Sequence, residues 1–108
     1  MVEVRYDREA LSIEARGHAR AERNQYGHDL VCAAISTLMQ AWAYAGLRTG
    51  HVMEVDKESG VFFARLDPDA TPSSELRSIF DGYVLGLKLC AENYPENVRV
   101  INASEMAG

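Results

Sequence analysis

The chain contains, from Asp29 to Gly46, the stretch DLVCAAISTLMQAWAYAG. Its apolar residues recur every three or four positions, which is the period of an α-helix with one buried face. The residues of that face are Val31, Ile35, Leu38, Trp42 and Ala45. We expect a helix that begins at about Asp29 and stops at Gly46, because glycine often terminates helices. The segments on either side of this helix then decide the fold.

Two strands are expected before the helix. In each of them apolar residues alternate with polar or charged ones, a period of two that is typical of half-buried strands. The apolar positions are Val2, Val4, Tyr6, Leu11, Ile13 and Ala15. We expect a hairpin across residues 7–10 and an end of the second strand at Gly17. Residues 19–28 are polar and show no period, which predicts a loop.

Two further strands, a second helix and a last strand are expected after it. Residues 51–56 and 61–66 flank a short connection that contains glycine, which predicts another hairpin. Thr71 as N-cap and Pro72 as first helical residue begin a helix of roughly twenty residues, and Pro95 marks its end. The apolar face of this helix comprises Leu76, Phe80, Tyr83, Leu87, Cys90 and Tyr94. Residues 98–101 form the last strand.

The order strand, strand, helix, strand, strand, helix, strand predicts an α+β fold. We expect a two-layer sandwich in which two helices pack on a mixed sheet. The chain has 108 residues, of which 47% are hydrophobic. This length and composition suit one domain over residues 1–108 with a single core.

The net charge and the hydropathy of the chain limit the kinds of partner that we expect. The formal net charge of −5 gives no basic field for phosphates, so we expect no direct nucleic-acid binding. Several N-terminal residues are charged, and we expect no apolar run that approaches the ~18 residues of a membrane span. Two cysteines are too few for a disulfide scaffold. We therefore expect a cytoplasmic protein without a membrane partner.

The two cysteines lie in different contexts. Cys90 falls on the apolar face of the second helix, where a thiol acts as a small hydrophobe. Cys32 lies one residue off the first apolar face, on a line with Asp29, Ser36 and Gln40. If Asp29 is the N-cap, Cys32 sits in the first turn, where unpaired amides stabilise a thiolate. Cys32 is therefore the candidate nucleophile, with an ordinary buried thiol as the alternative.

A thiolate nucleophile usually works with a histidine, and the chain has three. His18 is the best candidate because it follows Gly17 at a strand end, where backbones can approach closely. His28 is a sterically possible partner or an exposed residue at the helix start, and His51 is expected to be incidental. Asp29 is expected to cap the helix and orient the site. The spacings of Cys and His indicate no metal site, and we expect no cofactor.

A sequence resemblance sharpens this hypothesis. Residues 17–38 read GHARAERNQYGHDLVCAAISTL. The blocks GHA at 17–19, YGHD at 26–29 and VCAAIS at 31–36 resemble the signature of the ribosomal-processing cysteine protease Prp (YsxB-like) family. Weaker similarity covers nearly the whole chain, including ENYPENVRV at 92–100.

The resemblance implies a cysteine endopeptidase and a homodimer. It places the nucleophile on Cys32 and the general acid/base on His18, with Asp29 and Ser36 on characteristic family positions. The implied substrate is the precursor of the bacterial large-subunit ribosomal protein L twenty-seven. The enzyme would remove its short N-terminal extension after a motif that contains phenylalanine.

Substrate binding and two rival functions complete the expectations. The loop over residues 19–27 is expected to close over an apolar recess, and amides at the helix start are candidate oxyanion donors. The residues assigned to substrate contact are Gly17, Ala19, Tyr26 and Gly27. The rivals are a non-enzymatic ribosome-associated or RNA-associated adaptor and a redox-sensing thiol protein.

Overall fold

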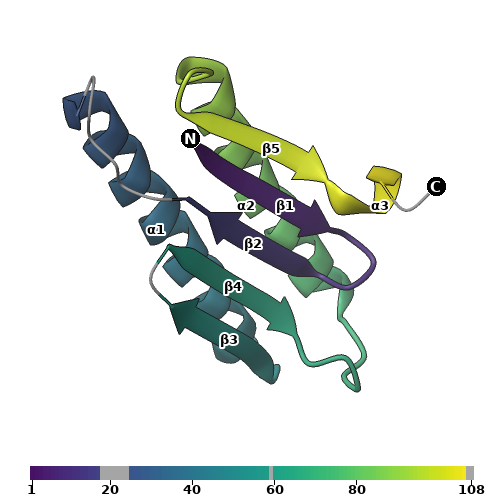
Figure 1. Ribbon diagram of the computed structural model, residues 1–108. Coiled ribbons are helices and arrows are strands. Elements are labelled where there is room, and N and C mark those ends of the chain that lie inside the picture. The colour runs from purple at the N-terminus through teal and green to yellow at the C-terminus, as the bar shows by residue number, and fades with distance from the viewer. Residues whose placement is uncertain (18–24, 59, 107–108) are drawn as a thin grey trace.

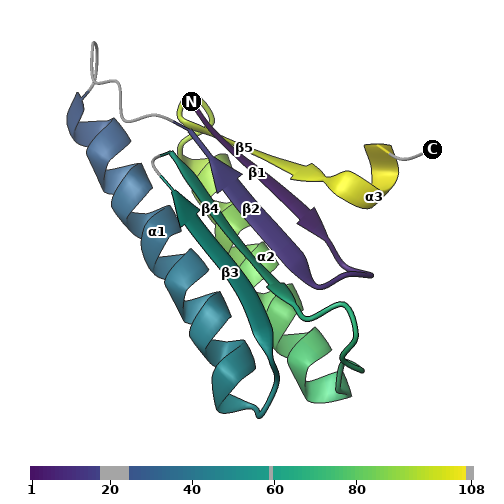
Figure 2. The ribbon, with the colours of Figure 1, turned by 60° about the horizontal axis from the view of Figure 1, so that its bottom comes forward.

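The computed structural model describes residues 1–17, 25–58 and 60–106, and for residues 25–29 and 106 it describes the backbone alone. Five strands form one sheet in the order β3-β4-β2-β1-β5. Helices α1 and α2 both pack on the same face of this sheet (Figure 1; Figure 2). The elements in chain order are β1 (Val2–Asp7), β2 (Ser12–Arg16), α1 (Gln25–Arg48), β3 (Met53–Glu58), β4 (Val61–Leu66), α2 (Ser74–Asn93), β5 (Val98–Asn102) and α3 (Ala103–Met106). The predicted α+β sandwich and its element order are confirmed, and α3 is an addition.

The sheet is mixed because β1 has neighbours of both kinds. It pairs with β2 antiparallel and with β5 in parallel, while β4 pairs antiparallel with both β2 and β3. The alternation in the sequence is confirmed, since the apolar residues expected to face the helices are buried. They are Val2, Val4, Tyr6, Leu11, Ile13 and Ala15. Leu11 lies in the hairpin turn with a positive φ of 49°, so β2 begins one residue later than predicted.

The start of α1 differs from the prediction. The helix begins at Gln25, four residues before the expected N-cap Asp29. Cys32 is therefore the eighth residue of the helix, about two turns from its start. Residues 25–28 are polar and lack an apolar period, which is why the sequence placed them in a loop.

The end of α1 also differs from the prediction. The helix passes through Gly46 and ends at Arg48, and Gly50 then adopts a positive φ of 83°. Gly46 is buried against β3, where an added Cβ would collide with the Met53 side chain. Gly46 is thus a site of close packing between helix and strand, and Gly50 takes the left-handed conformation that favours glycine.

Trp42 ties the two layers together. Its indole Nε1 donates a hydrogen bond of 3.1 Å to the carbonyl of Ala64 on β4. Its ring meets Phe80 of α2 edge to face, with centroids 5.1 Å apart. The buried face of α1 comprises Val31, Ile35, Met39, Trp42 and Ala43. Leu38 of the predicted face is only partly buried because Met39 turns further toward the core.

One segment of α1 contradicts the expectation that no apolar run reaches membrane-spanning length. Residues Leu30–Arg48 are long and apolar enough to cross a membrane by length and composition, with a hydropathy of 1.4. The alanines of this stretch raise its hydropathy without forming an obvious run of large residues. In the structure this segment carries the core residues Ile35, Met39 and Trp42, as a core helix does.

Helix α2 begins two residues later than predicted. Its N-cap is Ser73, whose Oγ accepts a hydrogen bond of 3.1 Å from the amide of Leu76. The expected N-cap Thr71 and first helical residue Pro72 precede it in the connection. The helix ends before Pro95, as predicted, and buries Leu76, Phe80, Val84 and Leu87. Of the predicted apolar face, Tyr94 is exposed and Cys90 only partly buried.

Candidate active site

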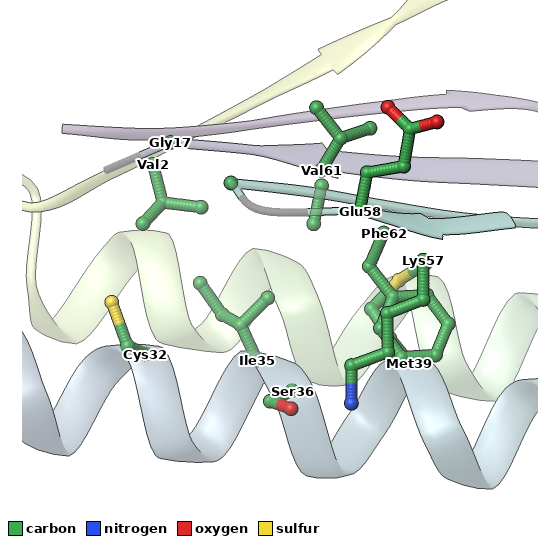
Figure 3. A pocket seen from close by; sticks show the side chains of 12 residues that line it. Val2, Gly17, Cys32, Ile35, Ser36, Met39, Lys57, Glu58, Val61 and Phe62 are labelled. Atoms are coloured by element: carbon green, nitrogen blue, oxygen red, sulfur yellow. The ribbon is translucent and has the colours of Figure 1, made fainter. Parts of the chain in front are cut away.

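Cys32 lies on the face of α1 that looks toward the sheet. Figure 3 shows its thiol pointing from the helix toward Val2 of β1. The side chain is partly buried and packs against the hydrophobic core. It lines an open cavity of about 240 Å³ between α1 and the sheet. The residues that α1 contributes to this cavity are Cys32, Ile35, Ser36 and Met39.

The opposite wall of this cavity comes from the sheet. Val2, Ala15 and Gly17 line it from the β1–β2 side, and the β3–β4 hairpin contributes the rest. The hairpin residues are Lys57, Glu58, Gly60, Val61 and Phe62. The apolar side chains among the lining residues, such as Val2, Val61 and Phe62, make the cavity suitable for an apolar group of a ligand.

Gly17 fixes the point where the chain leaves this wall. Its amide donates a hydrogen bond of 2.9 Å to the carbonyl of Gly60, which extends the β2–β4 pairing by one residue. An added Cβ at Gly17 would lie 2.9 Å from both Met1 O and Val2 Cα, so this close approach requires glycine. His18 follows directly in the sequence. The predicted histidine is therefore one residue from a wall that Cys32 shares.

Ser36 lies one turn beyond Cys32 on the same side of α1. Its hydroxyl accepts a hydrogen bond of 3.2 Å from the Gln40 amide. The predicted line of Cys32, Ser36 and Gln40 along the helix is therefore present. The side chain of Asp29, the fourth member of that line, lies outside the described part of the structure.

The structure revises the predicted substrate loop. Residues 25–28, including Tyr26, Gly27 and His28, belong to α1, so a loop to Gly27 or His28 is wrong. His18 and Ala19 lie outside the described residues. The assignment of Cys32 to the first helical turn is also wrong, because the unpaired amides of α1 precede it by about two turns. Amides at the helix start are therefore not adjacent to Cys32.

Cys90 and His51 lie away from this cavity. Cys90 is on α2, and burial raises the pKa of its thiol, which disfavours the thiolate. His51 follows the far end of α1, where its Nδ1 lies 2.9 Å from the hydroxyl of Thr49. Neither residue lines the cavity that Cys32 enters. Among the side chains of residues 1–17, 30–58 and 60–105, no group of three or more Cys, His, Asp or Glu residues has a metal-binding arrangement.

The β3–β4 hairpin is the part of the site that sequence reasoning missed. Lys57 lies with its Nζ 5.4 Å from the centre of the Phe62 ring, and both side chains line the cavity. No local motif marks these residues. They line the same cavity as Cys32 because β4 pairs with β2, a contact between segments far apart in the sequence.

Comparison with known proteins assigns the chain to a family. A family model described as cysteine protease Prp matches residues 1–99. The chain belongs to the Prp family of cysteine proteases. The resemblance found in the sequence is thereby confirmed, and the non-enzymatic adaptor is excluded. As a Prp family member, the protein is an enzyme that hydrolyses peptide bonds.

Solved structures share the Prp fold. The protein SMU.848 of Streptococcus mutans is 26% identical with a TM-score of 0.71, covering 94% of this chain and 90% of that one. An essential ribosomal processing protease Prp from Staphylococcus aureus, in complex with a covalently linked product peptide, is 24% identical. Its TM-score is 0.74, with 94% and 99% of the two chains covered. The same S. aureus protease with a substrate peptide has a TM-score of 0.72 at 23% identity, covering 94% and 96%. No curated protein matches the chain.

Proposed function

We propose that this Prp family member removes the N-terminal extension of ribosomal protein L twenty-seven, with Cys32 as nucleophile and His18 as general acid/base. One observation carries the assignment of the site. The Cys32 thiol enters an apolar cavity that is also lined by Gly17, the residue before His18. The S. aureus relative, described as a ribosomal processing protease that takes a peptide substrate, supports the choice of substrate class.

Cys32 and His18 supply the two groups that peptide hydrolysis needs. The Cys32 sulfur attacks the carbonyl carbon, and a C–S bond forms as the peptide C–N bond breaks. His18 gives its proton to the leaving amine. It then takes a proton from water, which attacks the acyl-enzyme, releases the new carboxylate and restores the thiol. The atoms balance with one water consumed for each bond cleaved.

The proposal gives His18 a second role, which is to stabilise the Cys32 thiolate. Because Cys32 lies about two turns inside α1, the helix dipole, which acts mainly within the first turn, gives it little help. An imidazolium next to the sulfur stabilises the thiolate directly. His18 is therefore needed to create the nucleophile as well as to protonate the leaving group.

The cavity beside Cys32 suits the expected phenylalanine of the cleavage motif. Its volume of about 240 Å³ and its apolar walls, with Ile35, Met39 and Phe62 among them, fit an aromatic side chain. Ser36 and Lys57 supply polar groups at the same cavity. Asp29 keeps its proposed role of orienting the site.

Cleavage of a peptide tests the proposal. The peptide spans the N-terminal extension of the organism's own L twenty-seven and the residues that follow it, and mass spectrometry locates the cut. We expect cleavage by the wild type and by Cys90→Ser, and none by Cys32→Ala or His18→Ala. Cleavage by Cys32→Ala would reject the assigned nucleophile. A wild-type protein that is inactive when fully reduced, but oxidises reversibly at Cys32, would favour the redox-sensing thiol.

The quaternary structure and the location are proposals of the same kind. A homodimer follows from the resemblance to Prp proteins, and light scattering after size-exclusion chromatography measures it directly. A cytoplasmic location follows from a substrate that is made on ribosomes. A monomer at all accessible concentrations would contradict the first of these proposals.

A further inference from the structure

A second cavity lies further along α1 from Cys32, toward the C-terminal end of the helix. Its volume is about 320 Å³, and it lies between α1 and the edge strand β3. Three large apolar side chains line it and remain exposed in part, namely Tyr44 (62%), Leu47 (52%) and Val55 (49%). Apolar side chains gathered on a concave surface are typical of a binding site.

The two cavities share a boundary. Lys57 and Phe62 line both of them. Figure 3 shows these two side chains near Met39, at the other end of the first cavity from Cys32. Val55 and Lys57 are two residues apart on β3, so both point toward α1. The cavities therefore adjoin each other along α1, from Cys32 to Leu47, with Lys57 and Phe62 between them. We call the two adjoining cavities the groove.

The groove has the length and the edge that an extended peptide needs. Tyr44 is twelve residues after Cys32, which is about 18 Å along the helix at 1.5 Å per residue. An extended chain covers this distance in about five residues. Strand β3 pairs with β4 alone in the described sheet, so its outer edge offers backbone groups to a peptide that lies beside it.

We propose that the second cavity is a remote substrate subsite, which binds an apolar side chain about five residues from the scissile bond. This inference rests on the proposed function and extends it, because the enzyme would then recognise two separated apolar groups of one peptide. Such a requirement explains how a protease with an open groove avoids general proteolysis. Short peptides that contain the cleavage motif alone fill half of the groove.

A peptide segment fits this surface better than a second copy of the chain does. The surface is a groove that continues directly from the cavity of Cys32 through Lys57 and Phe62. A two-fold interface needs a surface that complements itself. Tyr44, Leu47 and Val55 instead line a concave channel that suits a narrow, extended occupant.

The test compares two proteins on two peptides. The groove variant carries Tyr44→Gln and Leu47→Gln, which remove apolar surface and suit a helix. The matched control carries Leu85→Gln and Leu89→Gln, which are exposed by 58% and 47% on α2. One peptide, called the full peptide, spans the N-terminal extension of L twenty-seven and the residues that follow it, as described above. The other peptide is trimmed to the few residues around the cut.

The expected result is a change in KM for one pair only, the groove variant with the full peptide. For the full peptide the groove variant should show a KM about tenfold higher with kcat unchanged, as expected for a half-buried apolar side chain. For the trimmed peptide the wild type, groove variant and control should have the same KM. Fluorescence anisotropy with the full peptide, measured in a Cys32→Ala background, should show a Kd about tenfold higher for the groove variant than for the wild type and the control.

Each other outcome has a definite meaning. An unchanged KM for the full peptide in the groove variant overturns the subsite and leaves the proposed function intact. An equal rise in KM for both peptides overturns it as well, because the effect would then belong to the first cavity. A change in oligomeric state without a change in KM assigns the groove to a second copy. Failure of the wild type to bind or cleave either peptide rejects both proposals.

Discussion

At the scale of single residues, the proposed site needs an accessible side chain at one position and no side chain at another. Cys32 must be accessible, and the cavity gives it access. Gly17 must have no side chain, because Met1 and Val2 lie against it. Sequence reasoning proposed both residues as candidates, Cys32 from its polar line on the helix and Gly17 from its place at a strand end. It misplaced Cys32 relative to the helix start, because residues 25–28 carry no helical signal of their own.

Gly17→Ala should lower both stability and activity. The new methyl group meets backbone atoms at 2.9 Å, so the end of β2 must shift, at a cost of about 1–3 kcal/mol. That shift moves the chain that leads to His18 and should lower kcat/KM. Gly82→Ala is the control, because nothing lies within 4 Å of its added Cβ and a helical alanine stabilises by roughly 0.5–1 kcal/mol. Urea unfolding and peptide cleavage measure the two effects, and equal stability of both variants would contradict the packing at Gly17.

The alkylation rates of the two thiols, Cys32 and Cys90, should depend differently on pH. Burial raises the pKa of Cys90, so its thiol stays protonated at neutral pH and reacts slowly with iodoacetamide. Because the pKa of the Cys90 thiol is higher in the folded than in the unfolded protein, its protonation favours the folded state at neutral pH. This contribution to the free energy of unfolding is lost as the pH rises through the raised pKa. Alkylation followed by peptide mapping at several pH values should show Cys32 modified first at neutral pH. Equal rates at both cysteines would argue against an activated Cys32.

At the scale of elements, the positions of β1, β2 and β4 were predicted to within a residue, whereas β3 begins two residues later than predicted and both ends of α1 were misplaced. Alternation along β1 and β2 is a local signal, and burial follows it residue by residue. Helix ends depend on caps, and the predicted cap of α2, Thr71, lies two residues before the observed one. The structure selects Ser73, whose hydroxyl reaches the amide of Leu76. The hairpin wall of the cavity had no local signal, because it results from the pairing of β2 with β4.

Ser73→Ala should destabilise the protein while Thr71→Ala should not. Loss of the Ser73 hydroxyl leaves the Leu76 amide without its partner, which costs about 1 kcal/mol for an N-cap residue. Thermal or urea unfolding of the two variants provides the measurement. A larger loss in Thr71→Ala would show that α2 begins where the sequence alone predicted.

At the scale of the whole molecule, both helices cover one face of the sheet and leave the other face open (Figure 2). The cavity of Cys32 lies on the covered side, between α1 and the sheet. The open side carries ion pairs, in which Glu3 accepts a hydrogen bond of 2.6 Å from Arg99 on β5 and one of 2.8 Å from Arg5 on its own strand. The hydrophobic core and the proposed site thus both lie on the covered side of the sheet. The ion pairs of the open face are exposed, so substitution there should leave catalysis unchanged.

Glu3→Gln tests this separation through pH. Hydrogen bonds from Arg99 and then Arg5 lower the pKa of Glu3 below its ordinary 4.5. A lowered folded pKa contributes stability above 4.5 that is lost as the pH falls through the folded value. The wild type should therefore lose more stability on acidification than Glu3→Gln, while both cleave the peptide at the same rate at neutral pH. Loss of activity in Glu3→Gln would connect the open face to the site.

The central claim is that Cys32, activated by His18, attacks the substrate carbonyl. A chloromethyl ketone peptide that ends in phenylalanine tests it most directly, since such a reagent alkylates a nucleophile that it reaches through the substrate site. Intact mass and peptide mapping should find one adduct per chain, on Cys32, and His18→Ala should form it far more slowly. An adduct on Cys90, or equal rates with and without His18, would contradict the account.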